Sequence, residues 1–333
     1  MFYKYPSIDN LKSVKCDIEK LVGVGVMPTI NLKGTVKIHG TNAGVTLERD
    51  GAMHVQSRNR VLSIQSDNAG FCVFCEPNEY FPSIANTLFN QYSHFNYITI
   101  YGEWCGGNIQ AGVGISGMEK VFVIFSVAGR EEEDEPPTYI PVEDAGFSHE
   151  NNIYNISEFK TYSYCLDLAC QNSIDDLHDI TLAVEENCPV AAILNPKSTN
   201  TVGEGVVWTG EWNGHFIRFK DKGVRHRRGG SAKPRKVNVG GGYTHEQVAA
   251  AQKFCEQVVT EDRLLQGIEY MNEMQLDITP QNTGQYLKWV CNDIIKESVV
   301  ELAELSKADL TWKQLSKQIT RDVRDFYMNY KGI

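Results

Sequence analysis

The chain has 333 residues, 42% of them hydrophobic, and carries a formal net charge of −10 at pH 7. This length allows about two domains, and the hydrophobic and charged fractions are those of a globular protein. No apolar run approaches the ~20 residues that a membrane-spanning helix needs, and the first residues lack the apolar core of a secretion signal. We therefore expect no membrane association and a cytoplasmic location.

Nine cysteines are scattered along the chain without the spacing of a disulfide framework, which favours free thiols in a reducing compartment. Cys72 and Cys75 form one C-x-x-C pair, but no second pair completes a zinc site. We interpret these two cysteines as structural.

Positive charge is concentrated in one segment of this acidic chain. Residues 215–240 contain nine Lys or Arg and one Asp, a net charge of +8, which leaves −18 for the remainder. A basic segment on an acidic protein is typical of a site for a polyanion. The alternative is an ordinary solvated linker.

The N-terminal part is rich in strand signals. Predicted strands cover residues 35–37, 43–49, 53–58, 97–103, 121–127, 202–209 and 214–219. Asp50-Gly51 predicts a tight hairpin between the second and third of these. Alternation of strands and helices is absent, so we predict an α+β domain over 1–221 with largely antiparallel sheets.

The composition changes at residues 222–242, which are rich in Gly, Lys and Arg and which we predict to be a linker between domains. Beyond the linker the apolar spacing becomes helical. Thr244 is a candidate N-cap for a helix to about residue 259, and further helices are predicted over 263–274, 283–305 and 310–330. Residues 243–333 are therefore predicted to form a small all-α domain.

Lys37 is the leading candidate for a catalytic nucleophile. A free lysine has a pKa near 10.4, and lowering it by ~3 units destabilises the ammonium by about 4 kcal/mol. Burial, a bound metal or neighbouring cations such as Arg58, Arg218 and Lys220 can supply that energy. A lone lysine in a strand pair is usually a solvated residue, but the carboxylates that follow at Glu103 and Glu204 favour a catalytic interpretation.

A series of short motifs follows Lys37 in a fixed order. They are Lys37-Ile38-His39-Gly40-Thr41-Asn42, Ser57-Arg58, Gly102-Glu103, Phe122-Val123-Ile124-Phe125, Glu204-Gly205 and Phe219-Lys220. This order resembles the covalent nucleotidyltransferases, and within them the phage RNA ligase 2 family. His39 is typical of that branch, whereas DNA ligases and mRNA capping enzymes usually carry Asp at this motif position.

The resemblance implies an N-terminal nucleotidyltransferase (adenylyltransferase) domain, a helical RNA-binding domain and an ATP-dependent RNA ligase. In such an enzyme, Lys37 takes AMP from ATP, AMP passes to the 5′-phosphate of an RNA strand, and a 3′-OH displaces AMP to seal the nick. The implied cofactors are ATP and Mg²⁺, with Mn²⁺ as an alternative. The implied substrate of this RNA-repair enzyme is nicked duplex RNA, with an RNA/DNA hybrid as an alternative. We expect a monomer that, if phage-encoded, acts in the host cell cytoplasm.

The resemblance also assigns roles to individual residues. It implies that Lys37, Lys220 and Glu204 are catalytic, with Glu204 also holding the metal. ATP would contact Val36, Ile38, His39, Asn42, Arg58, Glu103, Phe125, Arg218 and Lys220. RNA would contact Gln110, Arg263, Asp293 and Glu297.

One departure from the family pattern concerns its last motif, in which two lysines are separated by one residue. We place this motif at Arg218 and Lys220, so that arginine replaces the first lysine. Arginine keeps the charge, but it is planar and is never deprotonated in proteins. We expect it to hold a phosphate still.

Two other functions remain open. A DNA ligase or GTP-using capping enzyme usually carries an OB-fold barrel after the last motif, where this chain has a basic linker and predicted helices. A non-catalytic RNA-binding protein built on an inactive ligase domain is the second alternative. Labelling by GTP rather than ATP would favour a capping enzyme, and a dispensable Lys37 would favour the binding protein.

Overall fold

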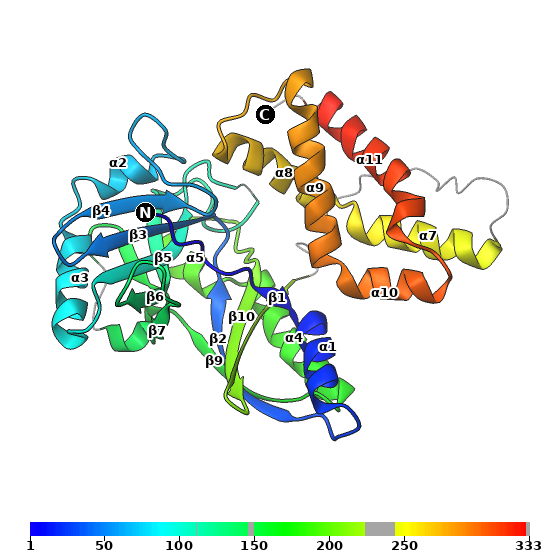
Figure 1. Cartoon of the computed structure of the whole chain (residues 1–333), viewed down its shortest axis with the longest axis horizontal. Coiled ribbons are helices and arrows are strands. Elements are labelled where there is room, and N and C mark those ends of the chain that lie inside the picture. The colour runs from blue at the N-terminus through cyan, green and yellow to red at the C-terminus, as the bar shows by residue number, and fades with distance from the viewer. Residues whose placement is uncertain (111, 146–149, 224–243, 331–333) are drawn as a thin grey trace. The chain divides into compact units, whose positions relative to one another are not determined.

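The computed structural model describes residues 1–110, 112–145, 150–223 and 244–330 (Figure 1). Contacts within the chain define two compact units. The first comprises Met1–Ile8 and Val24–Gly223, and the second comprises Asp9–Gly23 and Val224–Ile333. The predicted 1–221 domain differs from the first unit because residues 9–23 group with the helices. The predicted linker, except for Lys222 and Gly223, lies outside the described residues.

The first sheet of the first unit carries four antiparallel strands in the order β11-β10-β2-β9. They are β2 (Thr29–Lys37), β9 (Thr161–Asp167), β10 (Gly205–Trp212) and β11 (His215–Lys222). Buried and accessible residues alternate along β2, with Ile30, Leu32 and Val36 on the buried side. The odd-numbered residues that end at Lys37 therefore share the accessible face.

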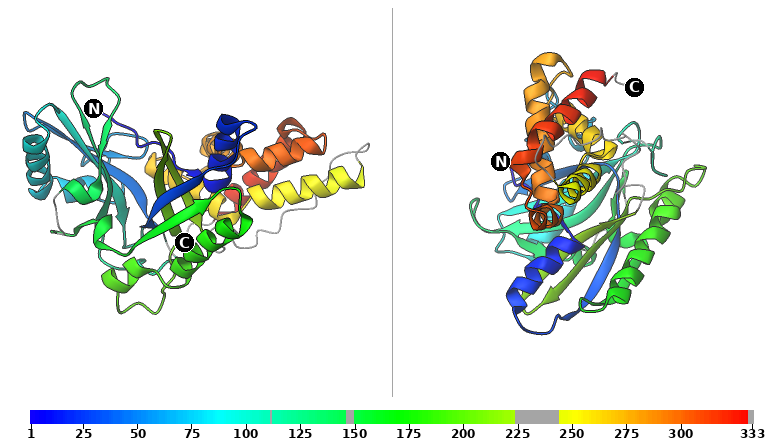
Figure 2. Two further views of the ribbon diagram at one scale, coloured as in Figure 1. Left: turned by 90° about the horizontal axis from the view of Figure 1, so that it is seen from below. Right: turned by 90° about the vertical axis from the view of Figure 1, so that its right-hand side faces the viewer.

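Helices cover the buried face of this sheet. Helix α4 (Gln171–Glu186) contacts β9, β10 and β11, and α5 (Pro189–Leu194) follows it (Figure 2). Leu177 and Val184 of α4 are fully buried, as is Trp208 of β10. The packing leaves the opposite face of the sheet available for polar side chains.

The second sheet has the order β4-β3-β5-β6-β7, and β8 pairs in parallel with β6. Its strands are β3 (Thr41–Glu48), β4 (Met53–Ser57), β5 (Tyr97–Cys105), β6 (Val121–Arg130), β7 (Thr138–Ile140) and β8 (Ile153–Asn155). Helices α2 (Phe71–Cys75) and α3 (Tyr80–Gln91) and the short 3₁₀ helices η1 (Val142–Ala145) and η2 (Ile156–Glu158) complete the unit. Antiparallel pairing of β3 with β4 confirms the predicted hairpin.

A β-bulge interrupts the pairing of β5 with β6. Tyr101 pairs with Ser126 and Gly102 pairs with Ile124, so that Phe125 is the extra residue. Phe125 is also the one residue of β6 that is not buried. A bulge redirects a side chain out of the regular alternation, which explains how this phenylalanine leaves an otherwise buried strand.

The second unit is helical apart from β1 (Asp9–Asn10). Its helices are α1 (Leu11–Val22), α7 (His245–Val258), α8 (Glu261–Glu273), η3 (Pro280–Asn282), α9 (Thr283–Glu297), α10 (Val299–Lys307) and α11 (Trp312–Asn329). Thr244 caps α7 through a capping box with Gln247, as predicted for an N-cap. None of the described helices is long and apolar enough to cross a membrane.

The prediction of one helix over 283–305 is wrong. Ser298 separates α9 from α10 with φ −117° and ψ 36°, outside the helical range. Ser298 is buried, and its amide still donates to the carbonyl of Ile294. No Gly or Pro lies at the break, so no local signal marks it. The overall α+β arrangement, with sheets first and helices after, is confirmed.

Candidate active site

Three neighbouring strands bring the candidate catalytic residues together around Glu204. Glu204 immediately precedes β10, and Gly205 lies opposite Lys37 of β2 on one side and Lys222 of β11 on the other. Cross-strand partners point to the same face of a sheet. The register therefore places the two lysines on one face, on either side of the residue that follows Glu204. His39 lies just beyond the end of β2.

Both oxygens of the Glu204 carboxylate have partners. Lys37 Nζ donates to Oε2 at 2.8 Å, and Lys222 Nζ donates to Oε1 at 2.7 Å. His39 Nδ1 lies 3.0 Å from Oε2. An ionised carboxylate only accepts hydrogen bonds, so Nδ1 of His39 carries the proton in this contact.

Glu204 is only 3% exposed, which makes its charge state the central electrostatic feature of the site. Burial alone would raise the pKa of this carboxyl. The charges of Lys222, Lys37 and His39 outweigh burial and hold the pKa well below its ordinary value. Glu204 is therefore an anion at neutral pH, and it fixes the positions of the groups around it.

Glu103 is the second carboxylate of the site and behaves differently. It lies on β5 opposite Asn42 of β3. Burial raises its pKa to about 7, and nearby Glu204 adds to the rise, whereas Lys37, Arg58 and a hydrogen bond from the Gly40 backbone lower it. The surface of Glu103 is partly accessible, but the surrounding protein still makes its charge costly. Glu103 is thus poised to change charge near neutral pH.

Gly40 allows the chain to pass close to β5. A Cβ atom at this position would lie 2.5 Å from the carbonyl oxygen of Trp104 and 2.8 Å from the Cβ of Cys105. The Trp104 backbone is held in β5 and cannot move aside. A side chain at residue 40 would therefore displace its own backbone, and with it His39 and Thr41, away from Glu103.

Phe125 and Arg218 form a separate cluster with Tyr5 of the N-terminal segment. The rings of Phe125 and Tyr5 lie 5.0 Å apart between centroids. The Arg218 guanidinium lies 4.6 Å from the Tyr5 ring centroid and donates a hydrogen bond to the Tyr5 hydroxyl. This cation–π contact engages Arg218, and within the described part of the chain Arg218 forms no ion pair with Glu204.

Lys222 is the site residue that the sequence reasoning missed. The run Lys220-Asp221-Lys222 also contains two lysines separated by one residue, and alternate strand residues share a face. This placement of the two-lysine motif fits the geometry better than the placement at Arg218 and Lys220. Asp221 turns to the other face, where it accepts a hydrogen bond from His178 Nδ1 at 2.7 Å.

The remaining predicted residues are distributed more widely. The side chains of Val36 and Ile38 are buried in the core, whereas Arg58 is exposed just after β4. Gln110 lies in a loop with a positive φ of 51°. In the second unit, Arg263 donates to Asp293 Oδ2 at 2.8 Å, and Glu297 ends α9. The ion pair of Arg263 and Asp293 neutralises charge that was predicted to face RNA.

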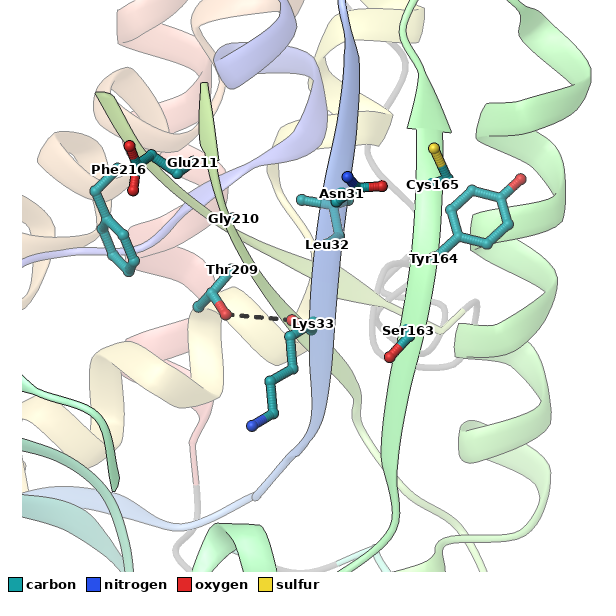
Figure 3. A pocket seen from close by; sticks show the side chains of 10 residues that line it. All are labelled: Asn31, Leu32, Lys33, Ser163, Tyr164, Cys165, Thr209, Gly210, Glu211 and Phe216. Carbon is teal, nitrogen blue, oxygen red and sulfur yellow. Dashed lines mark hydrogen bonds between the residues drawn. The ribbon is translucent and has the colours of Figure 1, made fainter. Parts of the chain in front are cut away.

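An open pocket of about 780 Å³ lies over the middle of the first sheet (Figure 3). It is lined by Asn31, Leu32, Lys33, Ser163, Tyr164, Cys165, Thr209, Gly210, Glu211 and Phe216. None of the predicted site residues lines it. Lys33 is four residues from Lys37, or ~13 Å along an extended strand, and is paired with Glu143 at 2.5 Å. We therefore place the candidate active site at Glu204 and not in this pocket.

Comparison with known proteins identifies the family. A family model described as RNA ligase matches residues 32–220, which include both carboxylates and Lys37. The chain belongs to the RNA ligase family. A search of curated proteins found no match.

Among solved structures, the chain is similar to an RNA ligase of Naegleria gruberi. A mutant of that protein with ATP and Mn gives a TM-score of 0.42 at 17% identity, over 67% of this chain and 57% of the other. The same protein with PPi gives 0.38 at 18% identity, over 67% and 56%. The chain thus spans less than two thirds of these proteins, and the family assignment rests on the family model.

Replacing Lys222 with alanine should destabilise the protein at pH 7 by about 1 to 3 kcal/mol, because buried Glu204 loses a charged partner. The depressed pKa of Glu204 contributes stability above the ordinary value of 4.5 that is lost as the pH falls through the folded value. The difference in the free energy of unfolding between Lys222→Ala and the wild type should therefore become smaller at acidic pH. Urea unfolding at several pH values measures this difference. The exposed Lys197 supplies a control, Lys197→Ala. An equal loss of stability in both variants would contradict the assignment of Lys222 as a partner of Glu204.

The stability of Glu103→Gln relative to the wild type should change with pH in the opposite direction to that of Lys222→Ala. A carboxyl whose pKa rises from 4.5 to about 7 on folding makes the wild type less stable as the pH increases across that interval. As the pH rises across this interval, the free energy of unfolding of the variant should increase by on the order of 1 to 3 kcal/mol relative to that of the wild type, as measured by urea unfolding. Glu143→Gln is the matched control, because Lys33 lowers the pKa of Glu143 and reverses the sign. A pH-independent difference for Glu103→Gln would rule out the raised pKa.

Proposed function

We propose that the protein is an ATP-dependent RNA ligase that seals 3′-OH/5′-phosphate nicks in duplex RNA. The observation that carries the proposal is the placement of Lys37 Nζ at 2.8 Å from buried Glu204, with Lys222 on the other carboxylate oxygen. Membership of the RNA ligase family supports the interpretation of this lysine as a nucleophile.

In the first step, the neutral amine of Lys37 attacks the α-phosphorus of ATP. A nitrogen–phosphorus bond forms, the bond from the α-phosphorus to the bridging oxygen breaks, and pyrophosphate leaves. A lysine ammonium paired with a carboxylate has no free electron pair, so Lys37 must leave Glu204 and lose a proton before it attacks. Lys222 and His39 keep Glu204 partnered while Lys37 moves.

The next two steps are also displacements at phosphorus. An oxygen of an RNA 5′-phosphate attacks the phosphorus of lysyl-AMP, which releases the Lys37 amine and forms an RNA-adenylate. A neighbouring 3′-OH then attacks the 5′-phosphate, loses its proton and expels AMP. Such reactions depend mainly on positioning and on the neutralisation of phosphate charge.

The surrounding residues would bind the nucleotide. Glu103 would accept a hydrogen bond from a ribose hydroxyl, and Phe125 would stack on adenine from its bulge. Lys220 and Lys222 would hold the α-phosphate. Asn42 and Arg58 would contact a phosphate, with Arg58 as a bidentate donor. Arg218, held by Tyr5, would act by supporting the wall of the nucleotide site beside Phe125.

A divalent cation fits this donor set when ATP supplies the other ligands. Mg²⁺ typically binds through one or two carboxylates together with substrate phosphates and waters. Glu204 would hold it, and among the described residues no group of three or more acidic, His or Cys side chains forms a complete protein site. The ion would add positive charge at the phosphate oxygens. We propose Mg²⁺, with Mn²⁺ as an alternative.

The more specific proposal is that the enzyme belongs to the phage RNA ligase 2 branch and acts as a monomer in RNA repair. His39, which supports this branch by its place in the first motif, contacts Glu204 directly. A nick in an RNA/DNA hybrid is the alternative substrate. The helical second unit would bind the nucleic acid.

Intact-protein mass spectrometry after incubation with ATP and Mg²⁺ should show the addition of one AMP to the wild type and none to Lys37→Ala. Lys33→Ala, on the same strand and face, is the matched control and should still form the adduct. An adduct on Lys37→Ala would refute Lys37 as the nucleophile. Stronger labelling by GTP would favour a capping enzyme. If the purified protein already carries AMP, pyrophosphate should remove it.

A nick-sealing assay tests the substrate. A duplex RNA with one 5′-phosphorylated nick should be joined roughly tenfold faster or more than the same nick in duplex DNA, because the proposed substrate is A-form RNA with 2′-hydroxyls. Gel separation of the labelled strands measures the rates. Equal rates on both duplexes would contradict specificity for RNA. Sealing of single strands but not of the nicked duplex would contradict a nick as the substrate.

A further inference from the structure

Helix α11 carries a stripe of four cations on its exposed face. Lys313, Lys317, Arg321 and Arg324 are all exposed. Their spacing of four, four and three residues places them on one side of a helix. The side chains buried in the core of the second unit come from other positions of α11, namely Leu315, Ile319, Val323 and Tyr327.

Among the described residues, none of these four cations forms an ion pair with a carboxylate. Like charges at i,i+4 destabilise a helix by a few tenths of a kcal/mol per pair, and solvated helix faces normally mix both signs. The chain as a whole has a net charge of −10. Asp325, four residues after Arg321 and partly exposed, is the acidic residue that borders this stripe. The four exposed cations outnumber the acidic charge beside them, and on an acidic protein this excess is well explained by a polyanionic partner.

The dimensions of the stripe fit a nucleic-acid backbone. The helical rise from residue 313 to residue 324 is ~16 Å at about 1.5 Å per residue. A duplex carries about one phosphate per 1.7 Å of its axis, so a surface of this length always faces several phosphates. Contacts to phosphates hold nucleic acid without reading its sequence, which suits an enzyme that must act on breaks in any sequence.

We propose that this α11 stripe, Lys313, Lys317, Arg321 and Arg324, is a phosphate-binding surface for duplex RNA. The inference rests on the proposed RNA ligase function and names where the second unit holds the substrate. This surface is distinct from the RNA-binding residues predicted from sequence. Among those residues, Arg263 donates to Asp293, which already neutralises part of its charge. The stripe supplies positive charge that no ion pair within the described part of the chain offsets.

Substitution of all four cations by glutamine, K313Q, K317Q, R321Q and R324Q, tests the proposal in the full-length protein. Fluorescence anisotropy with a labelled, nicked RNA duplex, without ATP, gives the dissociation constant over a series of salt concentrations. We expect affinity to fall by about tenfold or more. The slope of log K against log salt should become shallower by about 3.6, because each of the four phosphate contacts contributes about 0.9 to the slope.

A matched control removes the same charge from scattered positions in the same unit. Lys253, Lys288, Lys296 and Lys307 are exposed on helices α7, α9 and α10, and their replacement by glutamine should change the slope by less than about 1. Unfolding curves confirm that both variants fold. The proposal is overturned if the stripe variant keeps the wild-type slope, if the control loses as much, or if the wild type does not bind the duplex.

Addition of AMP to Lys37 separates this proposal from the proposed function. The stripe variant should add AMP as fully as the wild type, because its substitutions leave every residue of the Glu204 site unchanged. A wild type that binds RNA through the stripe but adds no AMP, even after treatment with pyrophosphate, would refute the ligase and leave the surface intact. A wild type that adds AMP and binds RNA independently of the stripe would refute only the surface.

Discussion

A buried carboxylate held by two ammonium groups and an imidazole organises the first unit of this protein. A carboxylate as buried as Glu204 is costly unless it is paired and hydrogen-bonded. The pairing has to come from elements that are distant in sequence, since Lys37 and Lys222 lie on different strands. The β2–β10–β11 register is therefore a requirement for burying this charge as well as a consequence of backbone pairing.

The two carboxylates of the site are in opposite electrostatic states for a physical reason. Glu204 has cationic partners on both oxygens, which overcome its burial, whereas burial of Glu103 outweighs its cations and a second negative charge lies nearby. The site thus holds one fixed anion and one group that can be neutral or charged near pH 7. For the proposed ATP binding, this means that Glu103 can meet a ribose hydroxyl without adding a full negative charge beside the triphosphate.

Much of the fold could be predicted from local sequence. Strand alternation, the Asp50-Gly51 turn and the capping signal at Thr244 are encoded within a few residues of each element. The break at Ser298 could not be predicted, because neither a Gly nor a Pro ends α9. In the candidate site, Lys37 and Glu204 were predicted from the order of the sequence motifs. Lys222 was missed because the motif was placed two residues too early, at Arg218 and Lys220, although Lys220 and Lys222 match the two-lysine spacing without a substitution. The pairing of Lys222 with Gly205 of β10 supports the later placement.

The bulge at Phe125 has a consequence for any comparison of this strand with others. Downstream of the bulge, the alternation of β6 is out of phase with the alternation upstream. A strand without the extra residue would pair with β5 in the same register on both sides, because Ile124 opposite Gly102 and Ser126 opposite Tyr101 already point to opposite faces. Deleting Phe125 would therefore restore a regular ladder and leave every other side chain of β6 on its present face. An alignment with a strand that has no bulge needs a gap at Phe125, and without that gap it would assign the wrong faces to Val127 and Ala128.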